Sequence, residues 1–562
     1  MLARVAASRT LRRHPRAMAA PKPTRRERHL IKANTSTRRA RRGSRSHWVV
    51  PLLALLGCGD EASEAPFDAT MSNPAGGSDG TPGASSASAA AGATAAGAAG
   101  PGAAGGTATE ASPGAIPLSN DANAETPGTS SEAPAGSAEP DVPRGPTVAL
   151  TIEGGAGPFG AVRSTPAGVD CSAPPCRVEL PRGTALRLDA LSPPAGGIGF
   201  AGWSGACEGI DDCILVLDGD DVTLTATFAR ANVVFVTSTL TTGRLGNLTQ
   251  ADAICSERAR AGQLTGIFRA WLATQAVGAI DRLMPSRGWV RRDGRIVVDS
   301  PSDLVDGKLF HPLNLDEFGT NVGSTRKVWT GTGRDLRVEA GSNCNDWTAE
   351  TAPDGGIVAG RFGDAALGGK SFTTVTTARC DDRASLYCFE VGKTLRMTPQ
   401  RTDGRAAFAS SGRFALDGGV AGADSLCQND AAFAGLSGSF KALLSTSTAS
   451  AASRFDLTGA PWVRLDGVPL APTAAALFQA ETWDTSLNLS PSHAYYSSVG
   501  IVVGGSSMLA PGSLEDTCSD WTSLEGTTVQ GDAAAASPTG AFSSRPGLAC
   551  SSTNNLVYCL EE

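Results

Sequence analysis

Two sets of four cysteines with nearly the same spacing dominate the second half of this 562-residue chain. Successive cysteines lie 89, 36 and 8 residues apart in the first set and 91, 32 and 9 apart in the second. The sets are Cys255, Cys344, Cys380 and Cys388, then Cys427, Cys518, Cys550 and Cys559. A spacing repeated this closely indicates a duplication, in which each copy is one structural unit.

The residues around the cysteines also agree between the two sets. Ala251-Asp252 corresponds to Ala423-Asp424, and Cys344-Asn345-Asp346-Trp347 corresponds to Cys518-Ser519-Asp520-Trp521. We therefore place copy 1 at residues 231–391 and copy 2 at residues 405–562, with a linker at 392–404 between them.

Local patterns within copy 1 predict a mixture of strands, one helix and much irregular chain. A strand is expected near Phe235, and Thr249 followed by Asp252 resembles a capping box that opens a helix closed by Gly262. A strand at 268–272 follows, after which turn residues interrupt the chain up to the second cysteine. Such a unit buries little apolar surface per residue and needs covalent closure, and a bridge that closes a loop of about 100 residues or more contributes roughly 4–5 kcal/mol.

A third, smaller module is expected at residues 146–230. Alternating apolar residues at 148–152, 185–188 and 222–228 are typical of strands. Its four cysteines are Cys171, Cys176, Cys207 and Cys213, whose pairing the sequence leaves open. The segments 164–171, 200–207 and 225–228 resemble the small β-rich repeats of bacterial surface proteins, the internalin-type repeats among them, which implies a spacer or adhesive module.

The two copies resemble endostatin, the C-terminal domain of certain collagens. The resemblance rests on residues 251–272, on Val328-Trp329-Thr330-Gly331, on Cys344 with Trp347, and on Leu386-Tyr387-Cys388-Phe389-Glu390. It implies an α+β chain with two C-type-lectin-like domains in tandem. Cysteine spacing alone allows three pairings in each copy, and the resemblance implies the nested one: Cys255–Cys388 and Cys344–Cys380, then Cys427–Cys559 and Cys518–Cys550.

The N-terminal part predicts export. A basic stretch precedes the apolar run at 48–56, which is too short to span a bilayer and is typical of a signal peptide, so residues 1–57 are expected to be a leader. Leu55-Leu56-Gly57-Cys58 resembles the lipobox of bacterial lipoproteins, which implies a lipid on Cys58 and an outer-membrane or cell-surface location. An ordinary secretory signal with a chance cysteine is the alternative. Residues 58–145 are rich in Ala, Gly, Ser and Pro and predict a disordered tether.

Charge narrows the possible partners. Residues 1–57 carry 15 Lys and Arg and one acid, whereas the remainder carries 33 bases and 54 acids, for a net charge of −21. A chain this acidic disfavours nucleic acid and anionic lipid, because phosphate binders need a basic face. Contact with a membrane is therefore expected only through the N-terminal lipid.

Five residues are candidates for ligand contact: Trp329, Asp346, Trp347, Asp520 and Trp521. The Asp–Trp pair recurs in both copies, although a structural role fits it better, because such a tryptophan usually packs on the bridge while the aspartate accepts backbone hydrogen bonds. Trp329 has no counterpart in copy 2, which favours a specialised surface position.

The copies contain few residues of the kinds that form metal and catalytic sites. They contain only His311 and His493, at non-equivalent positions, and neither the zinc and heparin sites of endostatin nor the calcium motif of sugar-binding lectins has matching residues. We expect no catalytic residue, metal or cofactor.

The sequence therefore predicts a non-catalytic surface protein whose two lectin-like domains bind an unidentified glycan or protein. A structural spacer of the cell envelope, with no specific ligand, is the alternative. An enzyme is the third possibility, and it would need a pocket that places His311 or His493 beside an acid.

Overall fold

The computed structural model describes residues 145–543 and 545–562. The expected leader (1–57), Cys58 and the expected tether up to residue 144 lie outside the described residues. The described part is built from six mixed or antiparallel sheets and few helices, which agrees with the α+β class at this level. None of its helices has both the length and the apolar character that crossing a membrane requires.

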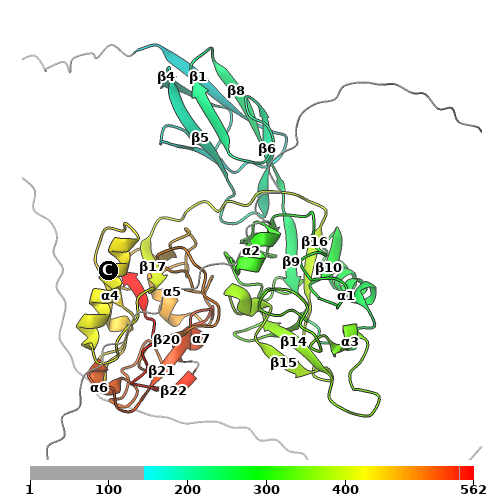
Figure 1. Ribbon diagram of the computed structural model, residues 1–562. Helices are drawn as coiled ribbons and strands as arrows, with labels where there is room; N and C mark the ends of the chain where they lie inside the picture. The colour runs from blue at the N-terminus through cyan, green and yellow to red at the C-terminus, as the bar shows by residue number, and fades with distance from the viewer. Residues whose placement is uncertain (1–144, 544) are drawn as a thin grey trace, which may run out of the picture. The chain divides into compact units, whose positions relative to one another are not determined.

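The module at residues 146–230, called the β-module below, is a pair of four-stranded sheets (Figure 1). One sheet has the order β4-β1-β8-β6 and the other β3-β2-β5-β7. The strands are β1 (Thr147–Gly154), β2 (Ala161–Thr165), β3 (Asp170–Cys171), β4 (Cys176–Pro181), β5 (Thr184–Leu191), β6 (Ile198–Gly205), β7 (Cys213–Leu217) and β8 (Val222–Arg230). Alternate residues of β1, β5 and β8 are buried in one shared core, as expected for strands with one solvated face.

Copy 1 contains a five-stranded sheet, β10-β16-β9-β11-β12, and a three-stranded sheet, β13-β14-β15. Its strands are β9 (Asn232–Val236), β10 (Ile267–Ala270), β11 (Trp289–Val290), β12 (Ile296–Val298), β13 (Lys327–Trp329), β14 (Ala359–Asp364), β15 (Thr376–Arg379) and β16 (Tyr387–Val391). Its helical segments are α1 (Leu248–Ala261), α2 (Pro301–Asp306), α3 (Cys344–Trp347) and the 3-10 helix η2 (Gly369–Phe372).

Copy 2 follows nearly the same order of elements, with sheets β18-β23-β17-β19 and β20-β21-β22. Its strands are β17 (Arg405–Ala409), β18 (Phe440–Ala442), β19 (Trp462–Arg464), β20 (Gly500–Val502), β21 (Thr527–Asp532), β22 (Arg545–Ala549) and β23 (Tyr558–Glu561). Its helical segments are α4 (Gly419–Phe433), the 3-10 helix η3 (Ala452–Arg454), α5 (Ala474–Gln479), α6 (Cys518–Trp521) and α7 (Pro538–Ser543). In both copies the last strand pairs antiparallel with the first, which a third strand joins in parallel.

Helix α1 is present where the sequence predicts it, but its N-cap differs. The capping side chain is Asn247, whose Oδ1 accepts from the backbone N–H of Gln250 at 3.0 Å, and not Thr249. Asp252 is turned inward, where it accepts from the backbone N–H of Ala270 in β10 at 2.8 Å. The acidic residue that suggested a capping box therefore joins the helix to its neighbouring strand (Figure 1).

Six disulfides close the described modules. The β-module contains Cys171–Cys176 and Cys207–Cys213. Copies 1 and 2 contain Cys255–Cys388, Cys344–Cys380, Cys427–Cys559 and Cys518–Cys550, which is the nested arrangement. The longest bridges tie α1 to β16 and α4 to β23, so each joins the helix of a copy to its last strand.

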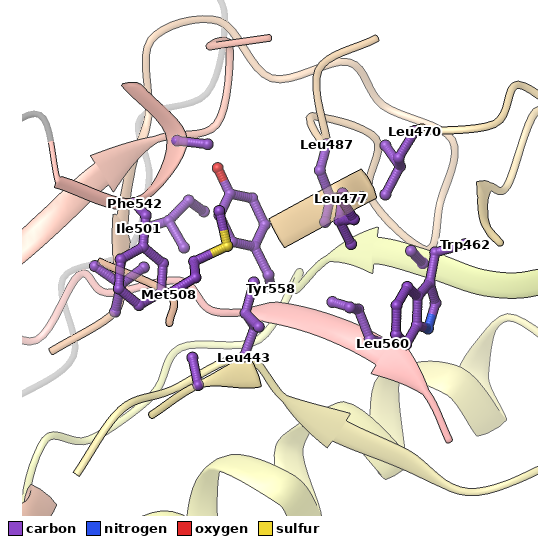
Figure 2. Packing of buried hydrophobic residues seen from close by; sticks show 14 of the residues in the cluster. Leu443, Trp462, Leu470, Leu477, Leu487, Ile501, Met508, Phe542, Tyr558 and Leu560 are labelled. Atoms are coloured by element: carbon purple, nitrogen blue, oxygen red, sulfur yellow. The ribbon is translucent and has the colours of Figure 1, made fainter. Parts of the chain in front are cut away.

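The core of copy 2 illustrates how irregular chain is packed. Tyr558 and Leu560, two residues apart on β23, point to the same side of the strand and into one cluster (Figure 2). Leu477 of α5 and Leu487 of the following loop reach the same cluster, and all four side chains are buried. Long loops are thus held by apolar anchors that contact the sheet.

Candidate ligand-binding site

The tryptophans proposed for ligand contact are buried. Trp329 is 1% exposed and its indole N–H donates to the carbonyl of Thr241 at 3.1 Å. Trp347 and Trp521 are fully buried, and their indoles donate to backbone carbonyls at 2.8 and 2.9 Å. A side chain enclosed in this way offers no face to a ligand in this structure, and packing accounts for these three residues.

The absence of Trp329 from copy 2 has a packing explanation. In copy 1 its ring lies 6.3 Å from that of Trp347, edge to face. In copy 2 the equivalent ring, Trp521, instead packs against Phe414 at 5.9 Å. One aromatic neighbour replaces the other, and Trp329 is a core residue and not a surface specialisation.

Asp346 and Asp520 hold neighbouring loops in place. Asp346 Oδ1 accepts from the backbone N–H of Gln275 at 2.9 Å. Asp520 accepts from the backbone N–H and the hydroxyl of Ser447 at 2.6 and 2.7 Å. Burial raises the pKa of the Asp520 carboxyl, but these hydrogen bonds and one from Thr517 outweigh it, and the pKa is lowered. Both carboxylates are therefore engaged in hydrogen bonds within the fold.

The Cys-x-Asp-Trp motif adopts a left-handed turn in both copies. All four residues of α3 have φ between 51° and 66°, and all four of α6 between 50° and 65°. The left-handed region costs roughly 1–2 kcal/mol for each such residue, so the surrounding structure must impose it. A disulfide, a buried tryptophan and the side chain that caps the turn (Asn343 or Thr517) supply that constraint.

Another shared feature is a buried arginine at the end of β19 and just after β11. Arg464 donates to Asp466 at 2.7 Å and to Asn488 at 3.1 Å, within copy 2. Arg291 makes the same two contacts in copy 1, with Asp293 and Asn314. Much of what the copies share is therefore internal scaffolding, and ligand-contacting residues are better sought where they differ.

All described residues belong to one compact unit of the chain, and this unit contains a cleft of about 1180 Å³. We call it the junction cleft, because the β-module, both copies and the linker all contribute to its wall. It is lined by Asp211, Asp212, Arg287, Asp299, Asp306, Lys308, Phe310, Arg396, Met397, Thr398, Pro399, Asp466, His493, Ala494 and Tyr495.

Ion pairs fix most of the charged side chains in the cleft. Arg287 pairs with Asp299 at 2.5 Å, and Arg396 with Asp212 at 2.6 Å. The hydrogen bond to Asp299 raises the pKa of the Arg287 guanidinium, although burial opposes it. Within the part of the chain that the structure describes, Asp211 and Asp306 are exposed and form no ion pair.

The copy 2 wall is held from behind by Arg464. Its guanidinium pairs with Asp466, whose carboxylate also accepts from the Tyr495 hydroxyl at 2.7 Å. Burial raises the pKa of Asp466, but Arg464 outweighs it, and the pKa lies below its usual range. The same guanidinium donates to the carbonyl of Leu309 in copy 1 at 2.9 Å, so the two walls are linked through one buried side chain.

The two histidines have different environments. His493 is exposed, has a left-handed φ of 61° and lines the junction cleft. His311 is buried and its Nδ1–H donates to the carbonyl of Ile296 at 2.7 Å. Burial, reinforced by Arg291, lowers the pKa of His311 to about 3. His311 is therefore neutral and enclosed, and no three His, Cys, Asp or Glu side chains of the described segments are grouped to hold a metal ion.

Of the cleft residues, the sequence singles out His493 alone, as a residue that an enzyme site would need. The cleft residues come from four parts of the chain, the β-module, copy 1, the linker and copy 2, and form no motif, so their convergence depends on how the modules pack. The one signal in the sequence is a difference between the copies. When the copies are aligned on Trp289 and Trp462, Arg287 corresponds to Ala460 and Lys308 corresponds to Glu481.

Comparison with models of known protein families gives no match, and a search of the curated proteins finds no similar chain.

Proposed function

We propose that this chain is an exported, lipid-anchored surface protein that binds a ligand without chemical conversion. The observation that carries the proposal is the junction cleft, which combines a volume of about 1180 Å³ with charged groups held in place by ion pairs. A concave site lined by a few fixed polar groups is the usual form of a ligand site. The ligand is a glycan or a protein that is displayed on another surface.

The proposed location rests on the sequence of the N-terminal part. A basic stretch, an apolar run at 48–56 and the lipobox-like Leu55-Leu56-Gly57-Cys58 support export and lipidation. Intact-mass analysis of the native protein tests this directly. We expect a chain that begins at Cys58, carries acyl groups and contains six disulfides, whereas an unmodified Cys58 contradicts the anchor.

We further propose that both copies are C-type-lectin-like domains of the endostatin type, and that residues 146–230 form an internalin-type repeat module. The nested bridges and the helix tied to the last strand support the first assignment. An experimental structure of the chain tests both, because its topology can be compared strand by strand with those families.

Binding itself is tested by presenting the full-length protein to a glycan array and to solubilised surface proteins. A partner that binds in a saturable manner supports the proposal. Capture of neither a glycan nor a protein contradicts it.

A structural spacer is the second candidate, favoured by the hydrogen bonds between modules. The backbone N–H of Phe200 in the β-module donates to the carbonyl of Arg396 in the linker at 2.9 Å, and Gly368 of copy 1 donates to Ala534 of copy 2 at 2.6 Å. These bonds suit a stiff rod as well as a binding platform. The binding screen separates the two, because a spacer has no saturable ligand.

A further inference from the structure

The junction cleft has the size and openness for an extended ligand. Its volume of about 1180 Å³ exceeds the roughly 300–1,000 Å³ of sites for compact small molecules. Phe310 and Met397 are only 4% and 2% exposed, but the wall as a whole presents apolar and polar atoms in similar amounts. A ligand that has both apolar and hydroxyl-bearing faces can match such a wall.

The wall of the cleft carries both hydrogen-bond donors and hydrogen-bond acceptors. Arg287, Lys308 and Arg396 are donors, because guanidinium and ammonium groups have no acceptor. Asp211 and Asp306 are acceptors, because an ionised carboxylate has no donor. The hydroxyl group both donates and accepts, so a ligand with many hydroxyls can satisfy the two kinds of group without carrying a charge.

The charges also argue against an anionic ligand. The guanidinium groups of Arg287 and Arg396 are already neutralised by Asp299 and Asp212, so neither offers a free positive charge to an anion. The chain after residue 57 carries a net charge of −21, which further repels acidic polymers.

The site is organised before a ligand arrives. Arg464 is 0% exposed and joins Asp466 and Tyr495 on the copy 2 wall to the Leu309 carbonyl of copy 1. On the opposite side, Phe200 of the β-module is bonded through its backbone to Arg396. Groups that are already fixed lose little conformational entropy on binding, which favours recognition of a polyhydroxylated ligand by several weak hydrogen bonds.

We propose that the junction cleft binds a neutral oligosaccharide, an inference that rests on the proposed binding function and names its ligand class. The test uses the full-length protein and an array of neutral, amino-substituted and acidic oligosaccharides, followed by titration calorimetry with the strongest neutral one. We expect binding of neutral oligosaccharides that changes little when ionic strength is raised, because no net charge is transferred.

Two variants locate the site. Ala494 is exposed and lines the cleft, so Ala494→Trp fills part of it, and Asp211→Leu removes an acceptor that no ion pair holds. We expect each to weaken the affinity by about tenfold or more, which corresponds to roughly 1.4 kcal/mol. Ala421→Trp, at an exposed position of α4, is the matched control and should leave the affinity within about twofold. Thermal unfolding of all three variants verifies that they are folded.

The outcomes separate the two proposals. If a neutral oligosaccharide binds equally well to both cleft variants, the cleft inference is overturned and the binding function stands. Exclusive binding of acidic or amino-substituted sugars, or capture of a protein and no sugar, also overturns the inference alone. If neither a sugar nor a protein binds, both proposals fall.

Discussion

His311 shows how one buried residue makes stability depend on pH. Its ring is enclosed and donates to the Ile296 carbonyl, and Arg291, Arg295 and Arg464 all act against a second proton. The folded state therefore keeps the ring neutral down to about pH 3, whereas an unfolded histidine takes up a proton near pH 6.5.

The sign of the effect follows from this difference. Above pH 6.5 neither state protonates the ring, and the full stability is present. As the pH falls from about 6.5 towards 3, only the unfolded state binds the proton, so His311 lowers the free energy of unfolding by about 1.4 kcal/mol per pH unit.

We predict that His311→Asn, which keeps an N–H near the position of Nδ1, flattens this part of the profile. Guanidinium unfolding of the full chain between pH 4 and 7 measures the slope. Equal slopes for the native protein and His311→Asn contradict the prediction.

At the scale of elements, the left-handed turns depend on a glycine that lies against their tryptophan. Gly331 has a φ of +66°, and a Cβ built on it would lie 2.8 Å from Trp347 Cζ2. Gly504 occupies the same place in copy 2, against Trp521. Both the backbone conformation and the space therefore require glycine.

We predict that Gly331→Ala destabilises copy 1 by more than the roughly 1–2 kcal/mol that a left-handed alanine costs. Gly341→Ala is the matched control, because Gly341 has a similar φ of +71° but open space around its Cβ position. Chemical unfolding of both variants measures the difference. If the two substitutions cost the same, the contact with Trp347 is not what fixes the turn.

The disulfides should differ in how much each one stabilises the folded chain, according to the length of the loop that it closes. Cys255–Cys388 spans 133 residues, whereas Cys171–Cys176 spans 5. By chain entropy the long bridge contributes about 5 kcal/mol and the short one about 2 kcal/mol. We predict that replacing both cysteines of the long bridge by alanine lowers stability much more than replacing those of the short one. Chemical unfolding of each double variant measures the loss of stability. Equal losses in the two variants would show that loop length does not determine how much a bridge stabilises the chain.

The sequence can predict those elements whose structure is determined by neighbouring residues in the chain, and it cannot predict those determined by distant residues. The duplication and the strands of the β-module follow from cysteine spacing and from alternation, which are local patterns. The left-handed turn does not, because Cys344, Asn345 and Asp346 all adopt a conformation that none of them favours, imposed by the disulfide and by Trp347.

The sequence suggests a surface position for Trp329 because copy 2 lacks this tryptophan, yet Phe414 from a distant segment fills its role there. The junction cleft could not be foreseen, because it arises from packing between modules.

At the scale of the whole molecule, Arg464 has a role that its equivalent Arg291 lacks. Both are buried and paired with an aspartate two residues later. Only Arg464 also donates across the boundary between the copies, to the Leu309 and Phe310 carbonyls. The contact couples the folding of copy 2 to that of copy 1, because neither carbonyl keeps its partner when copy 2 unfolds.

We predict that the two copies of the native chain unfold in one transition, and that Arg464→Met separates it into two. Removing the guanidinium leaves the buried Asp466 without its partner, which destabilises copy 2 by roughly 3–5 kcal/mol, and it also removes the bonds to copy 1. Arg291→Met is the matched control, because it breaks the equivalent pair with Asp293 inside copy 1 and leaves the boundary intact. Denaturant unfolding followed by tryptophan fluorescence and by calorimetry should show two steps for Arg464→Met and one weakened step for Arg291→Met. A single step in both variants would mean that the copies are coupled by other contacts, such as the Gly368 to Ala534 bond, and that Arg464 stabilises copy 2 alone.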